Sequence, residues 1–150
     1  MALFDVISED IKKAMIAKDK VALEALRGVK KEFLEAKTAK GASGELADDA
    51  ALKILQKMVK QRKESAQIFT EQNRPELAEN ELAEAAVIEK YLPAKLSDAE
   101  LEAEIKAIIA EVGAKTAQEM GKVMGVATKK LAGKADGKEI SAKVKALLNS

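Results

Sequence analysis

At 150 residues, the chain is long enough for one ordinary domain or for two small ones. It has no cysteine and no histidine, which excludes disulfides and both the serine–histidine and the cysteine–histidine hydrolases. The 26 basic and 25 acidic residues leave a net charge of +1, so net charge alone indicates no polyanionic partner.

The composition predicts an all-α protein. Hydrophobic residues make up 47% of the sequence, aromatic residues only 3%, and there are two prolines, so helix formers dominate. We find no apolar run long enough to span a bilayer and no export signal at the start, so we expect no membrane partner. Because the lack of cysteine also gives no reason for an oxidising compartment, we predict a cytoplasmic location.

The first half of the sequence predicts three helices, over residues 3–18, 19–39 and 49–72. Asp19 is the expected N-cap of the second helix. The glycine-rich residues 40–47 predict a flexible loop between the second and third helices. The stripe of the first helix that we expect to be buried consists of Leu3, Val6, Ile7, Ile11, Ala14 and Met15.

Arg62 interrupts the apolar face of the third helix, within the polar run 60–65. We interpret it as one half of a structural ion pair with a carboxylate of the next helix, either Glu84 or Glu89. The alternative is that Lys60 or Lys63 faces outward and binds a partner.

Proline residues mark the limits of the fourth helix. Pro75 suits a first helical position, and Pro93 ends the helix. The expected apolar face between them is Leu77, Leu82, Ala85, Ile88 and Leu92. Because a residue before proline avoids helical geometry, we place a subdomain boundary between Leu92 and Pro93. It separates an N-terminal helical subdomain of about four helices, residues 1–92, from a C-terminal one, residues 93–150.

The C-terminal subdomain is predicted to hold three short helices. Ser97 with Glu100, and Thr116 with Glu119, each fit a capping box, and Asp136 is the expected N-cap of the last helix. Three apolar stripes then enclose one small core. Their members are Leu101, Ile105, Ile108 and Val112, then Met120, Val123, Met124, Ala127 and Leu131, then Ile140, Val144, Leu147 and Leu148.

Charge is unevenly distributed along the sequence. Residues 76–111 hold ten acidic residues and three lysines, a net charge of −7, whereas residues 113–150 hold eight lysines and three acidic residues, a net charge of +5. Such lysines can neutralise phosphates, and the alternative is an ordinary solvated face. No arginine or aromatic residue accompanies them, so we expect contacts by shape and charge without base readout. The candidate RNA-binding residues are Lys115, Lys122, Lys129, Lys130, Lys134 and Lys138.

Gly121 and Gly125 lie four residues apart on one expected helix face. The missing side chains allow another backbone to approach closely. We interpret the pair as helix packing inside the subdomain, with close approach to a nucleic acid or a partner protein as the alternative.

The paired glutamates have a helical spacing that would suit a metal or an acid–base dyad. We assign Glu81 with Glu84, and Glu100 with Glu104, to solvated polar faces instead. No catalytic residue, metal ligand or cofactor is therefore predicted, and we expect no enzymatic activity from the chain on its own.

Four motifs in order resemble the GatB/YqeY family across essentially the whole chain. They are KQRKES at 60–65, Tyr91 to Pro93, MGKVMG at 120–125 and ADGK at 135–138. The resemblance implies a two-part helical fold. It also implies kinship with the tail of the B subunit of glutamine-dependent aminoacyl-tRNA amidotransferases, which contacts the outer corner of tRNA.

The resemblance assigns motif positions to Arg62, Tyr91 and Pro93, and to Gly121, Lys122, Gly125, Asp136 and Lys138. Gly137 departs from the pattern, because the tail has a proline or an asparagine–proline step there. The leading hypothesis is a non-catalytic module that binds structured tRNA. The alternatives are an adaptor for an amidotransferase or another protein and, third, an amidotransferase-type activity suggested only by the family name.

Overall fold

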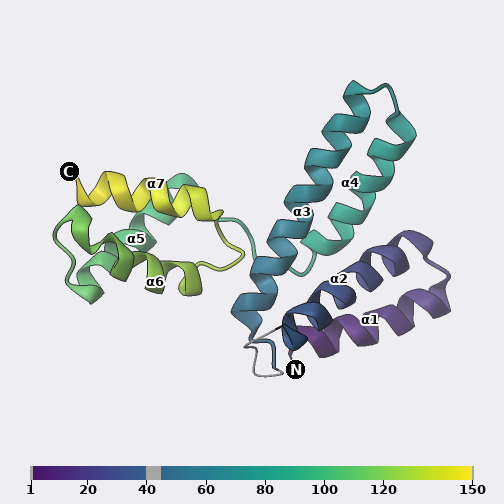
Figure 1. Ribbon diagram of the computed structural model, residues 1–150, viewed down its shortest axis with the longest axis horizontal. Coiled ribbons are helices and arrows are strands. Elements are labelled where there is room, and N and C mark those ends of the chain that lie inside the picture. Colours follow the sequence, from purple (N-terminus) through teal and green to yellow (C-terminus); the bar gives the residue numbers. More distant parts are fainter. Residues whose placement is uncertain (1, 40–44, 150) are drawn as a thin grey trace. The chain divides into compact units, whose positions relative to one another are not determined.

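The computed structural model describes residues 2–39 and 45–149, and every regular element in these residues is helical (Figure 1). The predicted all-α class is therefore confirmed. Most of the loop predicted at 40–47 lies outside the described residues, which resume at Glu45. The chain divides into two compact units, Met1–Leu92 and Pro93–Ser150, which we call unit 1 and unit 2 and describe separately.

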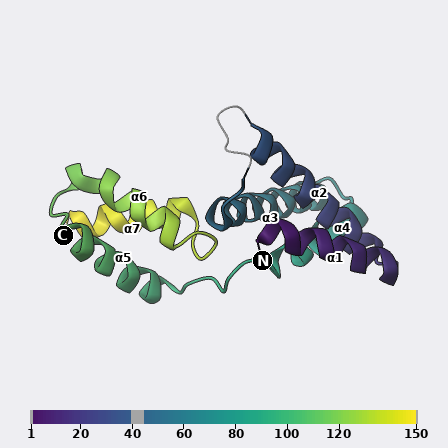
Figure 2. The same cartoon turned by 90° about the horizontal axis from the view of Figure 1, so that it is seen from below.

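Unit 1 consists of two helical hairpins. The first pairs α1 (Leu3–Ala17) with α2 (Lys20–Thr38), and the second pairs α3 (Asp48–Glu71) with α4 (Pro75–Glu89) (Figures 1 and 2). The side chain of Asp19 accepts a hydrogen bond from the backbone N–H of Ala22 at 3.1 Å, which confirms the predicted N-cap. Pro75 occupies the first turn of α4, where its missing N–H costs no helical hydrogen bond.

The core of unit 1 lies where the two hairpins cross. Its fully buried members follow the apolar stripes expected from the sequence and include Ile7, Leu26, Val29, Phe33, Leu55 and Ile88. The stripes fail near the turns of both hairpins, where Met15 and Leu77 are 54% and 39% exposed, and at the middle of α4, where Leu82 is 49% exposed. These three residues were predicted to be buried and are not, because helical periodicity gives the direction of a side chain but not whether a neighbouring helix covers it.

Unit 2 is a three-helix bundle of α5 (Asp98–Val112), α6 (Met120–Lys130) and α7 (Gly137–Leu148). The 3-10 turn η1 (Ala117–Glu119) leads into α6. The three predicted stripes supply the fully buried side chains of its core, which include Leu101, Ile105, Ile108, Val123, Leu131 and Val144. None of the helices in the described residues is both long and apolar enough to cross a membrane.

The predicted helix caps of unit 2 hold at two of three places. Ser97 and Glu100 form the full capping box of α5, and Asp136 caps α7. The box predicted at Thr116 is wrong, since Thr116 makes no side-chain cap bond. The carboxylate of Glu119 instead accepts from the backbone N–H of Lys115 at 3.1 Å, which holds the loop while the 3-10 turn delays the start of α6 to Met120.

Candidate functional site

The two glycines of the MGKVMG motif lie on the outward face of α6. The opposite side of this helix is buried through Val123 and Ala127, whereas Gly121 and Gly125 are exposed. A Cβ built on either glycine would meet no described atom within 4 Å beyond its chain neighbours and the backbone of its own helix. The prediction that they pack against another helix inside the subdomain is therefore wrong, because the amphipathic pattern of α6 points them away from the core.

Gly125 stands in the middle of a helix that it weakens. Glycine is about 1 kcal/mol less favourable than alanine in a helix interior, because it loses more backbone freedom on folding. A glycine can be favoured at such a position when it makes room for a close neighbour, yet nothing in the described residues occupies the space beside Gly125. Alanine at position 125 would make α6 more stable, so helix stability does not explain why this position is glycine.

Lys122 and Lys129 share this face with the glycines. Both are exposed, and they lie seven residues apart, which is close to two helical turns. They therefore point to the same side of α6, and Gly125 lies between them along the helix. Neither lysine takes part in an ion pair among the described residues. The structure therefore combines two uncompensated ammonium groups with the bare backbone of two glycines, and we call this set of four residues the α6 face.

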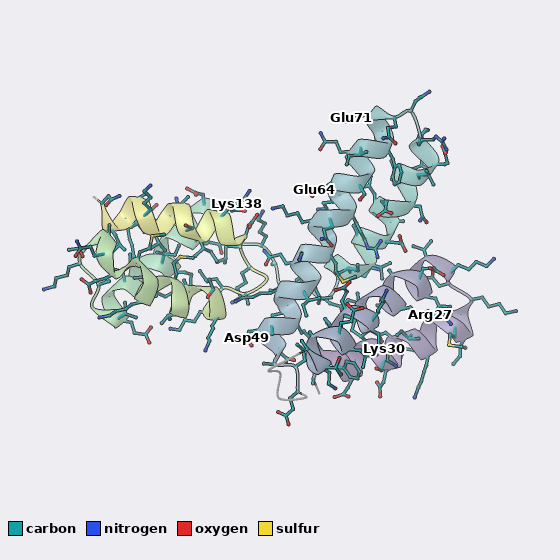
Figure 3. All side chains as sticks on the ribbon, in the orientation of Figure 1. Arg27, Lys30, Asp49, Glu64, Glu71 and Lys138 are labelled. Atoms are coloured by element: carbon teal, nitrogen blue, oxygen red, sulfur yellow. The ribbon has the colours of Figure 1, made fainter. Side chains whose placement is uncertain are left out.

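Three other candidate lysines are exposed but lie off the α6 face. Lys115 precedes α6 and Lys134 follows it, so they sit beyond opposite ends of a helix about 16 Å long. Lys138 lies in the first turn of α7 (Figure 3). The lysines thus follow the length of α6 instead of converging on one pocket, an arrangement suited to an extended anion.

Lys130 is the exception among the six candidates. Its Nζ lies 2.7 Å from Oε2 of Glu111, which links the end of α6 to the end of α5. Similar ion pairs join the half-buried Lys143 to Asp98 and the exposed Lys95 to Glu139. Because Glu111 already compensates the charge of Lys130, this lysine is a weaker candidate for phosphate binding than Lys122 or Lys129.

The last motif shapes the start of α7. Asp136 accepts from the backbone N–H of Lys138 at 3.2 Å, so its role in this structure is that of a helix cap. Gly137 is the first residue of α7, the position that proline favours in helices. The departure from the tail's proline is therefore compatible with the same helix start, and Gly137 is exposed with free space for a Cβ.

The motif in α3 has its partners inside unit 1. Nη1 of Arg62 lies 3.1 Å from Oε2 of Glu84 and 3.5 Å from Oε2 of Glu81. The predicted ion pair of Arg62 with Glu84 is confirmed, whereas Glu89 pairs with Lys63. The assignment of Glu84 to a solvated face is wrong, because α4 turns this carboxylate toward Arg62 and leaves the residue only 8% exposed.

Gly28 of α2 makes room for this ion pair, a role that the sequence did not reveal. A Cβ on Gly28 would lie 3.3 Å from Nη2 of Arg62. Burial raises the pKa of the Glu84 carboxyl, Arg62 lowers it, and the nearby Glu81 and Glu24 carboxylates raise it further, with a raised pKa as the net result. Three helices therefore meet at a half-buried charge network, which explains an arginine on an otherwise apolar stripe.

Tyr91 is also engaged inside unit 1. Its hydroxyl donates a hydrogen bond to the Asp10 carboxylate, which ties the end of α4 to α1. Burial is the main cause that raises the pKa of Tyr91, and the contact with Asp10 adds to it. Pro93, the first residue of unit 2, is half-buried. The motif residues Arg62 and Tyr91 thus hold helices together, whereas Gly121, Lys122 and Gly125 of the α6 motif are exposed.

The described residues contain no group of three side chains from the acidic, histidine and cysteine classes that could hold a metal ion. Several of their carboxylates act instead as helix caps or in ion pairs. The chemistry that the α6 face offers is hydrogen bonding and charge, from two ammonium groups and a helix surface without side chains at its centre.

Comparison with known proteins gives a match to the family described as Yqey-like protein over residues 4–148. Several curated relatives are named "Altered inheritance of mitochondria protein 41, mitochondrial". The one from Clavispora lusitaniae is 35% identical over 77% of this chain and 68% of its own length. The corresponding values are 34%, 71% and 57% for Lachancea thermotolerans, and 29%, 96% and 80% for Pyrenophora tritici-repentis. The match thus spans little more than half of the Lachancea protein.

These names correct the expected cytoplasmic location, because the relatives are named as mitochondrial proteins. The expectation relied on the absence of cysteine, which separates oxidising compartments from reducing ones. It does not separate one reducing compartment from another, so the composition was never able to identify the cytoplasm.

Proposed function

The chain belongs to the YqeY-like protein family, and from that premise we propose that its C-terminal unit binds structured RNA, tRNA in particular, through the α6 face. The observation that carries the proposal is that Gly121 and Gly125 are exposed on the same side of α6 as two lysines, Lys122 and Lys129, that form no ion pair among the described residues. No neighbour in the described residues accounts for this arrangement, whereas a phosphate backbone lying along the helix would.

Two physical features support an RNA backbone as the ligand. Ammonium groups on either side of Gly125 can each neutralise a phosphate, and the absence of side chains at the glycines lets a sugar–phosphate strand reach the helix surface. The exposed lysines at both ends of α6 extend the positive surface. Binding through phosphates alone favours recognition of a folded RNA by its shape.

The choice of tRNA comes from the resemblance to the amidotransferase tail. The MGKVMG motif provides the whole α6 face apart from Lys129, and the ADGK motif starts α7. Since the first position of α7 suits proline as well as glycine, the Gly137 departure does not argue against a shared mode of contact.

A filter-binding titration of the full chain with tRNA at several salt concentrations tests the proposal. We expect affinity to fall steeply as salt rises, because each phosphate contact releases bound counterions. The double variant Lys122→Ala/Lys129→Ala should bind more weakly and show a salt slope smaller by about 1 to 2 units.

The matched control is Lys53→Ala/Lys57→Ala, which removes two exposed lysines from α3 in unit 1. It should bind tRNA as the unaltered chain does. Absence of binding at micromolar protein, binding that ignores salt, or an equal loss in both double variants would each contradict the proposal.

The second candidate is a protein adaptor that docks a helix of an amidotransferase or another partner on the α6 face. The open space beside Gly121 and Gly125 favours it equally, since small residues four apart also let a second helix approach closely. Capture from a nuclease-treated lysate separates the two candidates. A partner that stays bound without RNA, and that Gly125→Leu releases, would favour the adaptor over the RNA module.

A further inference from the structure

Most of the large apolar side chains that are exposed in the described residues lie in two stretches of unit 1, whereas the proposed RNA-binding surface belongs to unit 2. Six large apolar residues are exposed among those described. Four of them lie within one helical turn of the loops that close the two helical hairpins. Leu82 lies at the middle of α4, and the sixth, Leu34, lies within α2. Apolar groups that cluster near the end of a hairpin are more informative than scattered ones, because a cluster can exclude water from a contact.

The end of the α1–α2 hairpin, residues 12–20, is basic. Met15 and Ile16 are 54% and 83% exposed there. Four exposed lysines and Asp19 give this segment a net charge of +3. The carboxylate of Asp19 caps α2, and Nζ of Lys13 lies 3.8 Å from Oδ1 of Asp10. Lys12, Lys18 and Lys20 form no ion pair among the described residues. We call residues 12–20 the basic end.

The end of the α3–α4 hairpin, residues 64–82, is acidic. Ile68 is 51% exposed, and Leu77 and Leu82 lie beyond it on α4. Five glutamates and Arg74 give a net charge of −4. Glu81 is held by Arg62, whereas the other four glutamates are exposed, and Figure 3 shows Glu64 and Glu71 along the half of α3 that leads to the turn. We call residues 64–82 the acidic end.

We propose that the basic end of one copy of this chain binds the acidic end of another copy. Each end joins exposed apolar side chains to charge of a single sign, and the two signs are opposite, so each provides what the other lacks. The turns of the two hairpins lie apart on unit 1 (Figure 1), and none of the ion pairs found among the described residues joins one end to the other.

The contact joins two different surfaces, and every copy of the chain carries both the basic end and the acidic end. Repeating such a contact gives a closed ring or pair if the rotation between successive copies returns to the first copy, and an open filament if it does not. Five apolar side chains make a small interface, and exposed charges attract strongly only at low ionic strength. The association is therefore weak, dependent on concentration and reversed by salt.

Sedimentation velocity of the nucleic-acid-free full chain tests this inference. We expect the average mass to rise with protein concentration at about 0.03 M salt and to return to that of the monomer at about 0.5 M salt, where charges are screened within a few ångströms. Two triple variants reverse one end each. They are Lys12→Glu/Lys18→Glu/Lys20→Glu and Glu71→Lys/Glu76→Lys/Glu79→Lys.

Each triple variant alone should remain monomeric, because both of its ends then carry the same sign of charge. An equimolar mixture of the two should associate again, since one brings two acidic ends and the other two basic ends. The control Lys31→Glu/Lys53→Glu/Lys57→Glu makes the same change in net charge at exposed lysines elsewhere in unit 1. It should associate as the unaltered chain does.

Three results would overturn the inference. They are a monomer at every concentration in low salt, association that survives both reversals, or a mixture of folded variants that stays monomeric. The variants Ile16→Gln and Leu77→Gln leave the charges in place and should each weaken association at least several-fold. If neither does, the apolar part of the proposed contact is refuted even where a reversal disturbs folding.

Discussion

The motifs of α3 and α6 make a contrast within one chain. In α3, Arg62 is half-buried, and two carboxylates of α4 and a glycine of α2 surround it. In α6, Gly121 and Gly125 are exposed and have nothing beside them. Both stretches resemble the same family pattern, yet Arg62 has its partners inside unit 1, whereas the two glycines have no close neighbour among the described residues.

This contrast separates two reasons for an unusual residue in a helix. An arginine on an apolar stripe is costly unless it is paired, and Arg62 is paired, so the stability of unit 1 explains it. A glycine within a helix is costly unless something needs the space, and no atom of the described residues does. The first motif is therefore explained by folding, whereas the two glycines of the second fit the contact with another molecule that we propose.

The largest effect that we expect is on the free energy of unfolding when the ion pair of α3 is removed. Replacement of Arg62 by alanine leaves the buried Glu84 carboxylate beside Glu81 without a compensating cation. Loss of one partner from a buried pair typically costs several kcal/mol, and we expect about 3 kcal/mol here. Urea unfolding followed by circular dichroism would measure the loss.

Lys63→Ala is the matched control for Arg62→Ala. It removes the neighbouring ion pair with Glu89, whose two side chains are about half exposed. Exposed pairs contribute little, so we expect a loss of about 0.5 kcal/mol. Equal losses from the two variants would show that Arg62 is no more structural than a surface lysine, and the contrast would fail.

A smaller change in stability, this time a gain, is expected when a glycine of α6 is replaced. Gly125→Ala adds a methyl group where there is open space and removes the cost of glycine in a helix, so unit 2 should gain about 1 kcal/mol. The same methyl group should weaken tRNA binding, because it stands where the backbone is proposed to approach. Thermal unfolding and filter binding of one variant thus measure both consequences.

Gly28→Ala is the control inside unit 1. Its new Cβ would lie 3.3 Å from an arginine nitrogen that two carboxylates hold in place, so the usual gain should be absent. A gain at Gly28 equal to that at Gly125 would mean that the ion pair yields easily. A loss of stability at Gly125 would mean that α6 is covered after all.

Local sequence chemistry was enough to predict most of the fold. Asp19, Pro75, Ser97 and Asp136 each start a helix as expected, because capping and proline geometry depend only on nearby backbone. The pairing of Arg62 with Glu84 was also predicted, since a buried guanidinium needs a carboxylate and few are within reach.

What failed depends on contacts between distant parts of the chain. Met15, Leu77 and Leu82 lie on the expected apolar stripes but are exposed, because periodicity does not encode which positions a neighbouring helix covers. Gly121 and Gly125 carry a packing pattern, but whether a helix faces them is likewise a property of the assembled bundle. The role of Gly28 had no signal at all in the sequence.

The smallest effect that we expect concerns pH and the Glu84 carboxyl. Burial, with help from Glu81 and Glu24, raises the pKa of Glu84 in the folded protein above its ordinary value of 4.5, despite the opposing effect of Arg62. A raised folded pKa means that the native state binds this proton more readily than the unfolded chain does. The contribution of Glu84 to stability is therefore fully present below pH 4.5 and is lost as pH rises through the folded pKa.

Glu84→Gln isolates this contribution from the other carboxylates, since glutamine keeps the shape and does not titrate. As the pH falls from about 7 toward 4.5, the stability of the unaltered protein should rise relative to that of the variant. Urea unfolding of both proteins across this range gives the difference directly. A difference that shrinks as the solution becomes more acidic would mean that Arg62 outweighs burial, and that Glu84 is held as a firm ion pair with a lowered pKa.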